Sequence, residues 1–287
     1  MYDEFPLKKL PEGELHGYLW DLDDPERVVC IVHGIGEYGG RFDRVACRFR
    51  DAGMAVVSMD LRGHGKSPGK KGHCAPREKV LSDIDALISW AMEKYPGKKI
   101  VLYGHSMGGN IALDYRKRGK FSHIPSAYLI SAPWIELVRS IPSVLYRAVK
   151  AASKAAPHLT IGSNVKEEYL GNPQSVRPYR ENPMVHNRIS LLCAIEGFET
   201  GRRLEEGTLE GNGKSDGIPV MIMHGAMDRI CSPEASRRTA DTMRKRGERV
   251  EYREFPGLYH EIHNGGGDSR GDEVIDEMIR WIREAAG

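Results

Sequence analysis

The feature that most constrains this chain is a short apolar segment that runs into a glycine–serine–glycine turn. Residues 100–103 have the composition of a buried strand, Gly-His-Ser-Met-Gly follows at 104–108, and an apolar-periodic segment without proline comes next. This order predicts a strand, a sharp turn and a helix, with Ser106 exposed at the turn. The amides at the start of such a helix favour negative charge beside the serine. The pentapeptide alone is a weak signal, but its context makes Ser106 a candidate nucleophile.

The bulk properties predict an ordinary globular protein. The 287 residues suffice for one large α/β domain with an insertion, and 42 basic against 40 acidic side chains give a net charge of +2. This balance does not point to a nucleic-acid partner. Five scattered cysteines without a CxxC pair favour a reducing compartment and argue against a zinc site or a disulfide framework. With no basic-then-apolar leader and no run of membrane-spanning length, we expect a cytoplasmic protein.

Strand-like and helix-like segments alternate along most of the chain. This alternation predicts a mainly parallel central sheet with helices on both faces, an α/β class. Strands are expected at 15–22, 27–33, 55–60, 99–103, 127–131, 220–224 and 250–255. Helices are expected at 41–51, 76–94, 107–118, 233–246 and 273–285.

The alternation stops between residues 133 and 215, where no strand pattern is found. The segment opens with apolar residues at helical spacing, and Pro142 predicts a helix that begins near Ser143. No acid occurs from 137 to 165, and the basic residues lie off the apolar stripe, which comprises Leu137, Val138, Ile141, Val144, Leu145, Ala148, Val149 and Ala152. We interpret 133–215 as a helical cap inserted into a core formed by 1–132 and 216–287. The alternative is a helical pair on the core with a solvated basic face.

A nucleophilic serine needs a base, and the base needs a carboxylate that orients it. Asp228 follows the apolar strand 220–223, and His260 follows the strand 251–255, so both are expected at the carboxyl edge of the sheet, where parallel sheets build their sites. The order serine, acid, histidine is that of hydrolases with a nucleophile elbow. Asp216 and Asp241 remain rival acids, and His263 remains the rival base.

An oxyanion site needs two amides aimed at the developing charge. One is expected from Met107, directly after the serine, and the other from Ile35 in the glycine-containing loop His-Gly-Ile-Gly-Glu at 33–37. We expect His33 to brace this loop and His64 and His105 to be structural.

These motifs resemble the monoacylglycerol lipase and lysophospholipase-like branch of the α/β-hydrolases, which is also grouped with serine aminopeptidases. The resemblance covers residues 30–75, 99–135 and 219–264. It is carried by HGIGEYGGRF at 33–42, DLRGHGKS at 60–67, GHSMGG at 104–109, HGAMD at 224–228 and FPGLYHEIH at 255–263.

The resemblance implies an α/β-hydrolase fold with a helical cap and an esterase that acts on acyl chains. It implies a triad of Ser106, Asp228 and His260, with oxyanion amides from Ile35 and Met107. Glu37 and Arg41 match positions near the polar head of a glyceride, which implies a role in substrate binding. The cap is its weakest match.

The sequence thus predicts a serine carboxylic-ester hydrolase acting on acyl esters such as monoacylglycerols or lysophospholipids. We expect no metal and no organic cofactor. If the cap helix covers the acyl site, its stripe, with Val144 and Leu145, contacts the acyl chain, and its basic face favours transient membrane or micelle contact. A serine aminopeptidase, with Glu37 holding the substrate amine, an acyl thioesterase, and a non-catalytic ligand-binding hydrolase fold remain alternatives.

Overall fold

The structure, a computed structural model, describes residues 2–171, 181–265 and 270–285. Its centre is an eight-stranded sheet with the order β1-β2-β4-β3-β5-β6-β9-β10. The first two strands, β1 (Asp3–Leu10) and β2 (Gly13–Trp20), are antiparallel to their neighbours, and the remaining pairs are parallel. The parallel strands are β3 (Arg27–Val32), β4 (Met54–Met59), β5 (Lys99–His105), β6 (Pro125–Ser131), β9 (Val220–Gly225) and β10 (Val250–Phe255). The predicted mostly parallel α/β fold is confirmed.

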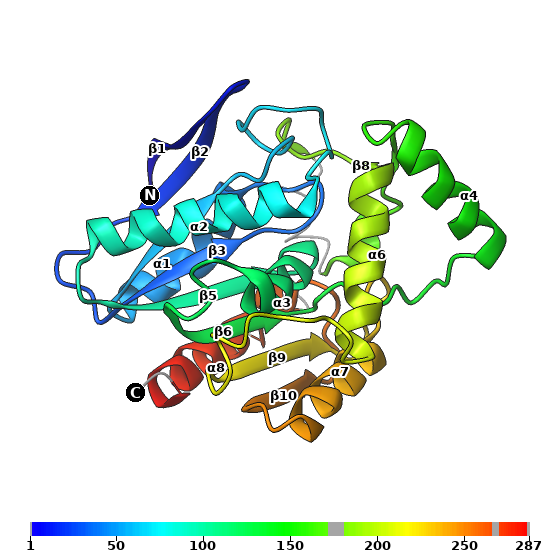
Figure 1. The fold of residues 1–287 in the computed structure, drawn as a ribbon. Helices are drawn as coiled ribbons and strands as arrows, with labels where there is room; N and C mark the ends of the chain where they lie inside the picture. The colour runs from blue at the N-terminus through cyan, green and yellow to red at the C-terminus, as the bar shows by residue number, and fades with distance from the viewer. Residues whose placement is uncertain (1, 172–180, 266–269, 286–287) are drawn as a thin grey trace.

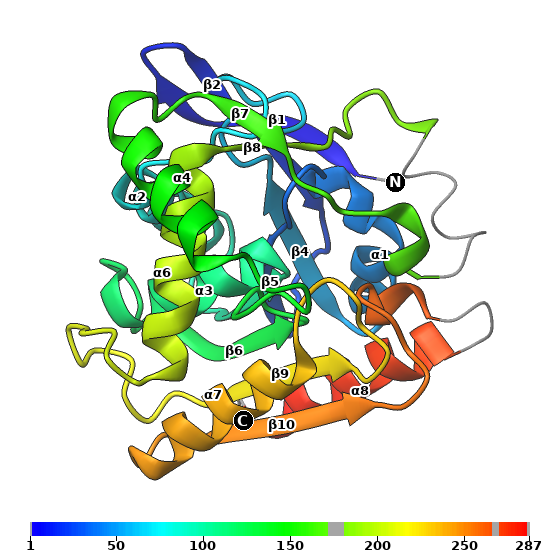
Figure 2. The same ribbon diagram turned by 90° about the vertical axis from the view of Figure 1, so that its right-hand side faces the viewer.

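Helices cover both faces of the sheet (Figure 2). On one face lie α1 (Asp43–Asp51) and α8 (Arg270–Ala285). On the other lie α2 (Arg77–Lys94), α3 (Met107–Arg118), α6 (Leu191–Glu205) and α7 (Pro233–Lys245). The apolar run of β3 explains this arrangement, because Val29 and Ile31 pack on the first layer while Val28, Cys30 and Val32 pack on the second.

The segment 133–215 leaves the sheet after β6 and returns before β9. It contains α4 (Ser143–Ala155), β7 (Thr160–Gly162), the 3-10 turn η2 (Glu167–Tyr169), β8 (Arg188–Ser190) and α6. Figure 1 shows α6 standing between the strands and α4, which is the helix farthest from the sheet. Residues of α6, such as Cys193 and Leu204, share one hydrophobic core with α2 and α3. The insertion is therefore anchored by α6 and carries α4 on its outer side.

Two expectations about strands were wrong. The segment 133–215 does contain strand structure, because β7 and β8 form a short antiparallel pair. Each of them has only three residues, too few to produce a readable alternation. The sequence analysis also missed β1, an edge strand that is exposed or half-buried along its whole length. In the described residues no helix is long and apolar enough to cross a membrane.

Candidate active site

Ser106 lies at the junction of β5 and α3 in a strained backbone conformation. Its φ is 56° and its ψ is −119°, in a region that L-residues seldom occupy. The flanking glycines make this turn possible by close packing. A Cβ on Gly104 would lie 2.4 Å from the carbonyl oxygen of Gly108, and one on Gly108 would lie 2.1 Å from the carbonyl oxygen of Val32. The turn therefore projects Ser106 from the carboxyl edge of the sheet.

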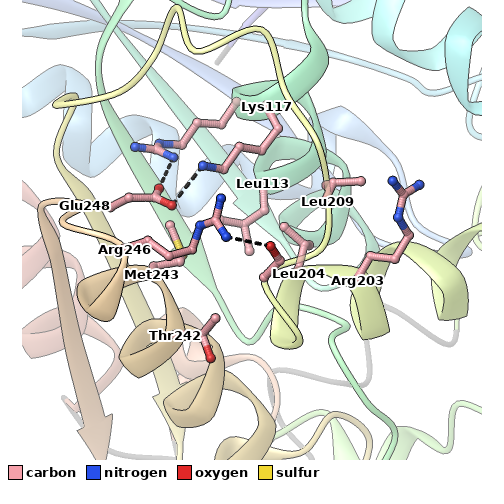
Figure 3. A pocket seen from close by; sticks show the side chains of 11 residues that line it. Leu113, Lys117, Arg203, Leu204, Leu209, Thr242, Met243, Arg246 and Glu248 are labelled. Atoms are coloured by element: carbon pink, nitrogen blue, oxygen red, sulfur yellow. Dashed lines mark hydrogen bonds and ion pairs between the residues drawn. The ribbon is translucent and has the colours of Figure 1, made fainter.

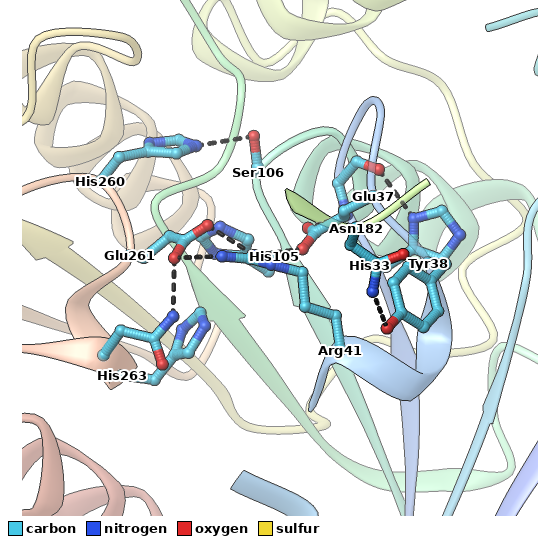
Figure 4. Close-up of polar contacts among 12 residues, drawn as sticks. His33, Glu37, Tyr38, Arg41, His105, Ser106, Asn182, His260, Glu261 and His263 are labelled. Carbon is cyan, nitrogen blue, oxygen red and sulfur yellow. Dashed lines mark hydrogen bonds and ion pairs between the residues drawn. The ribbon is translucent and has the colours of Figure 1, made fainter. Parts of the chain in front are cut away.

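Ser106, His260 and Asp228 form one chain of hydrogen bonds. The Ser106 Oγ–H donates to His260 Nε2 over 2.9 Å (Figure 4). His260 Nδ1–H donates to Asp228 Oδ2 over 2.6 Å. This direction follows because an ionised carboxylate can only accept, which fixes the tautomer of His260. All three residues are buried and come from the ends of β5, β10 and β9. The structure thus brings together the three residues that the sequence singled out.

Asp228 accepts hydrogen bonds from other groups besides His260. His224 Nε2 donates to Oδ2 over 2.9 Å, while the amides of Ile230 and Cys231 donate to Oδ1 over 2.7 Å and 3.1 Å. Burial alone would raise the pKa of Asp228, but the His260 charge and the bonds from both histidines outweigh it and hold this pKa below its usual range. Asp228 is therefore an ionised carboxylate in a fixed orientation.

The pKa of His260 is shifted in the opposite direction to those of its neighbours. Burial works to lower the pKa of His260, but the Asp228 charge and hydrogen bond overcome it, so this pKa lies above its usual value. Burial lowers the pKa of His263 to about 4 and that of His105 well below its usual value. His260 is thus the ring in this cluster that gains a proton most readily.

The rival residues lie elsewhere or have other partners. His263 Nδ1 lies 3.4 Å from the Tyr103 hydroxyl, and His105 Nδ1 lies 2.9 Å from Ser131 Oγ. Asp216 and Asp241 are largely exposed, with side chains 66% and 51% accessible, next to Lys117 and Arg244. His105 and His263 therefore lie behind the hydrogen-bonded chain, and neither aspartate belongs to it.

The loop after β3 lies directly beside Ser106. A Cβ on Gly34 would lie 3.1 Å from Ser106 Cβ. His33 braces the loop as expected, because its Nδ1–H donates to the Gly34 carbonyl over 2.7 Å while its Nε2 accepts from the Leu61 amide over 2.9 Å. Ile35 follows in this loop. Met107 is the first residue of α3, and the amides of a first helical turn have no partner within the helix.

Glu37 and Arg41 are engaged with protein groups. Glu37 Oε1 accepts from the Gly34 amide over 2.7 Å, and Arg41 Nη1 donates to Glu37 Oε2 over 2.8 Å. Arg41 also binds Glu261 through both of its terminal nitrogens. Burial and the nearby Glu261 charge raise the pKa of Glu37, and they outweigh the opposing effect of Arg41. Glu37 is 4% exposed, so its carboxylate is a loop support in this conformation.

Val144 and Leu145 lie apart from the other predicted site residues. They are 77% and 53% exposed, because α4 contacts its surroundings through Tyr146, Val149 and Ser153. The expected orientation of the stripe was therefore wrong.

The neighbouring Ile141 and Tyr146 line a groove of about 600 Å³ between the 135–141 loop, α4 and α6. A smaller cavity of about 20 Å³ lies between α3, the end of α6 and α7 (Figure 3). Neither is lined by a predicted site residue.

Two residues of the site were missed by the sequence analysis. His224 orients Asp228, and Glu261 binds Arg41. His224 precedes Asp228 by four residues, and Glu261 directly follows His260, so closeness in sequence to the candidate acid and base was the available signal. Within residues 2–171, 181–265 and 270–285 no cluster of three histidine, cysteine or acidic side chains could hold a metal ion.

The strand–turn–helix unit around Ser106, the parallel sheet and the surrounding helices define an α/β-hydrolase, a serine hydrolase by class. The chain belongs to the serine aminopeptidase S33 family, which matches residues 23–266. It is 31% identical over 270 residues to a monoacylglycerol lipase of Mycolicibacterium smegmatis, covering 92% of this chain and 91% of that one.

Solved structures of lipases have the same fold as this chain. The monoacylglycerol lipase of Paleococcus ferrophilus superposes with a TM-score of 0.81 at 30% identity, over 95% of this chain and 99% of that one. A soluble variant of the monoglyceride lipase of Saccharomyces cerevisiae shares the fold, with a TM-score of 0.84 at 21% identity over 99% and 94% of the two chains.

Proposed function

We propose that this enzyme is a lipid ester hydrolase that cleaves acyl esters through a covalent intermediate on Ser106. The observation that carries the proposal is the buried chain Ser106–His260–Asp228, with Ser106 in a strained turn at the start of a helix. In this proposal residues 1–132 and 216–287 form the catalytic core, and 133–215 form the cap.

The acylation step follows from the hydrogen bonds. Ser106 Oγ attacks the ester carbonyl carbon while its proton passes to His260 Nε2, and Asp228 stabilises the imidazolium that forms. The amides of Ile35 and Met107 bind the oxyanion of the tetrahedral intermediate. His260 then donates its proton to the leaving alcohol oxygen, the ester C–O bond breaks, and the acyl group remains on Ser106.

The deacylation step repeats this proton transfer with water. His260 accepts a proton from water while the water oxygen attacks the acyl carbon. The proton then passes from His260 to Ser106 Oγ as the fatty acid leaves. Each step uses the neutral form of His260 as the base. The low pKa of Asp228 supports this scheme, because the carboxylate stays charged throughout the working pH range.

Monoacylglycerols and lysophospholipids are the proposed substrates. The names of the Mycolicibacterium smegmatis relative and of the Paleococcus ferrophilus structure support the first of these. The peptidase alternative requires a free carboxylate for the substrate amine. Glu37 does not supply one in this conformation, because both of its oxygens accept from protein donors. Ester hydrolysis is therefore favoured over peptide hydrolysis, and an acyl thioester remains to be compared by assay.

The outer face of the cap is proposed to contact lipid surfaces. Val138, Ile141, Val144 and Leu145 are exposed apolar side chains at the start of this segment. Arg139, Arg147 and Lys154 are exposed around them, and no acid occurs between 137 and 165. An apolar face with a basic surround is the pattern of helices that lie in an anionic membrane interface.

A substrate panel tests the proposal. p-Nitrophenyl esters, monoacylglycerols, lysophospholipids, an acyl-coenzyme A and an aminoacyl anilide are assayed with the wild type and with Ser106→Ala, with and without detergent. We expect turnover of the oxygen esters and loss of it in Ser106→Ala. Preferential turnover of the anilide or the thioester would reassign the substrate class, and full activity of Ser106→Ala would refute the mechanism.

A further inference from the structure

Glu261 forms a buried ion pair directly beside the base. It is 2% exposed, and it binds Arg41 through two parallel bonds, Nη1 to Oε1 over 2.6 Å and Nη2 to Oε2 over 2.8 Å. Asn264 Nδ2 donates to Oε2 over 2.6 Å. A bidentate pair of this kind fixes both partners in geometry as well as in charge.

Arg41 continues the connection to the opposite side of Ser106. Its Nη1 also donates to Glu37, whose other oxygen accepts from the Gly34 amide. Figure 4 shows Arg41 between Glu37 and Glu261. A continuous line of buried polar contacts therefore joins the loop after β10, which carries His260, to the loop after β3, which carries Ile35.

The contacts at Gly34 determine the direction of the neighbouring amide. Glu37 holds the Gly34 N–H, and His33 holds the Gly34 carbonyl. That carbonyl and the Ile35 N–H belong to one planar peptide unit. The His33 bond therefore fixes the peptide unit that carries the Ile35 N–H, and the Glu37 bond fixes the unit directly before it.

We propose that Glu261 is a positioning residue for hydrolysis, which holds the oxyanion loop in register with the base through Arg41 and Glu37. The inference rests on the proposed function, because it assigns Glu261 a part in the same reaction. Glu261 itself touches neither Ser106 nor the position of the substrate carbonyl, and it acts through the Arg41–Glu37–Gly34 contacts.

The charges around His260 affect its pKa, so the pH dependence of the rate reports on Glu261 independently of stability. Groups that face its ring come from several elements: Asp228 after β9, Ser106 and His105 at the end of β5, Glu37 and Arg41 after β3, and Glu261 and His263 beside it. Glu261 and Glu37 both favour the protonated ring. Removing the Glu261 charge leaves Arg41 less compensated, so the acidic limb of the rate profile should shift to lower pH.

The test compares Glu261→Gln with Glu261→Asp and a matched control. Glu248 also accepts from two cations, Arg116 and Lys117, and its side chain is 7% exposed, but it lies beside the cavity between α3 and α7 (Figure 3). Glu248→Gln thus removes a similar buried ion pair away from the site. kcat and KM for p-nitrophenyl acetate, their pH dependence and the thermal unfolding midpoint are measured for each variant.

For Glu261→Gln we expect kcat to fall roughly 10- to 100-fold with KM nearly unchanged, the scale of loss for a misplaced catalytic group. Its acidic limb should move to lower pH. Glu261→Asp keeps the charge, so the acidic limb of its pH–rate profile should stay in place while kcat falls. This variant decides the question if Glu261→Gln does not fold. Glu248→Gln should change the unfolding midpoint without either kinetic effect.

Wild-type kcat and an unmoved limb in Glu261→Gln would overturn the inference, as would the same kinetic losses in Glu248→Gln. Ser106→Ala separates this failure from that of the proposed function. If Ser106→Ala is inactive while Glu261→Gln behaves as wild type, only the role of Glu261 is refuted. If Ser106→Ala remains active, the proposed mechanism itself is refuted.

Discussion

Three buried histidines lie close together behind Ser106, and their protonation differs. The ring centroid of His105 lies 5.0 Å from the ring centroid of His260 and 4.9 Å from that of His263. Only His260 of these three has an ionised carboxylate as a hydrogen-bond partner and a raised pKa. The low pKa values of His105 and His263 keep those rings neutral near pH 7. This contrast supports the proposed role of His260 as the proton acceptor.

The pH profile of the reaction is the first prediction. The rate for a soluble short-chain ester should rise through one proton loss as His260 becomes neutral, and then level off. Because the pKa of His260 is raised, the midpoint should lie above about 6.5, the usual value for histidine. Stopped assays with p-nitrophenyl acetate from pH 4 to 9 measure it. A midpoint near 4 would instead identify a ring such as His263.

At this scale much of the site could be predicted from sequence. Ser106 and Asp228 follow apolar strands and His260 follows the more polar strand β10, and parallel strands bring their carboxyl ends to one edge. The Arg41–Glu261 pair could not be predicted in this way. Arg41 and Glu261 are 220 residues apart, and the residues around one of them do not indicate the other as its partner. Such a pairing depends on side-chain reach within the folded site.

The helix α4 of the insertion 133–215 is the element whose orientation differs most from the expectation. Its inner contacts are made by few residues: Tyr146 packs edge-to-face on Phe198 of α6, and Lys150 pairs with Glu199. The longer apolar stripe faces outward, with Val144 77% exposed. Helical periodicity identified the helix and its start near Ser143, but it could not tell which partner the apolar residues face.

The second prediction concerns this outward face. Val144→Asp and Leu145→Asp should weaken binding to anionic vesicles about tenfold or more, because burying such a side chain contributes about 1.5–3 kcal/mol. Turnover of vesicle-borne monoacylglycerol should fall accordingly, while turnover of monomeric p-nitrophenyl acetate should not. Vesicle co-sedimentation and parallel assays measure both.

Met92→Asp is the control for this experiment. Met92 is an exposed apolar residue of α2, 40% accessible and outside the insertion 133–215. Its replacement should leave vesicle binding unchanged. Equal losses in all three variants, or none in the α4 variants, would contradict lipid contact through α4.

The whole molecule buries several histidines in neutral form, which makes its stability depend on pH. Burial lowers the pKa of His33 and His263 to about 4, and the pKa of His64 lies well below its usual value. Below about pH 6.5 these rings bind protons in the unfolded chain but not in the folded one. The free energy of unfolding should therefore decrease as the pH falls from about 6.5 towards 4.

Urea unfolding at pH 5 and pH 7 measures this third prediction. Each such ring contributes a slope of up to about 1.4 kcal/mol per pH unit, while His260, with its raised pKa, contributes in the opposite direction and loses its contribution as the pH rises through that value. Replacing His64 by Gln should reduce the slope. A free energy of unfolding that stays constant or increases on acidification would contradict the neutral state of these rings.

At the scale of the molecule, the central parallel strands were predictable because both of their faces are buried and their sequences are largely apolar, as in 28–32. The strand β1 was not, since an edge strand exposed on the surface needs no apolar alternation. The pair β7–β8 was too short to read. The strands that escaped prediction lie at the edge of the sheet or in the insertion 133–215, where tertiary contacts decide structure.

The central claim is that Ser106 forms the covalent acyl intermediate, and intact-mass spectrometry after fluorophosphonate treatment tests it most directly. The wild type should gain one adduct that maps to the peptide containing Ser106 and should lose ester hydrolysis in the same proportion. Ser106→Ala should fold with an unchanged circular dichroism spectrum, gain no adduct and show no turnover. An adduct on another residue with full loss of activity, or an active and unlabelled Ser106→Ala, would contradict the mechanism.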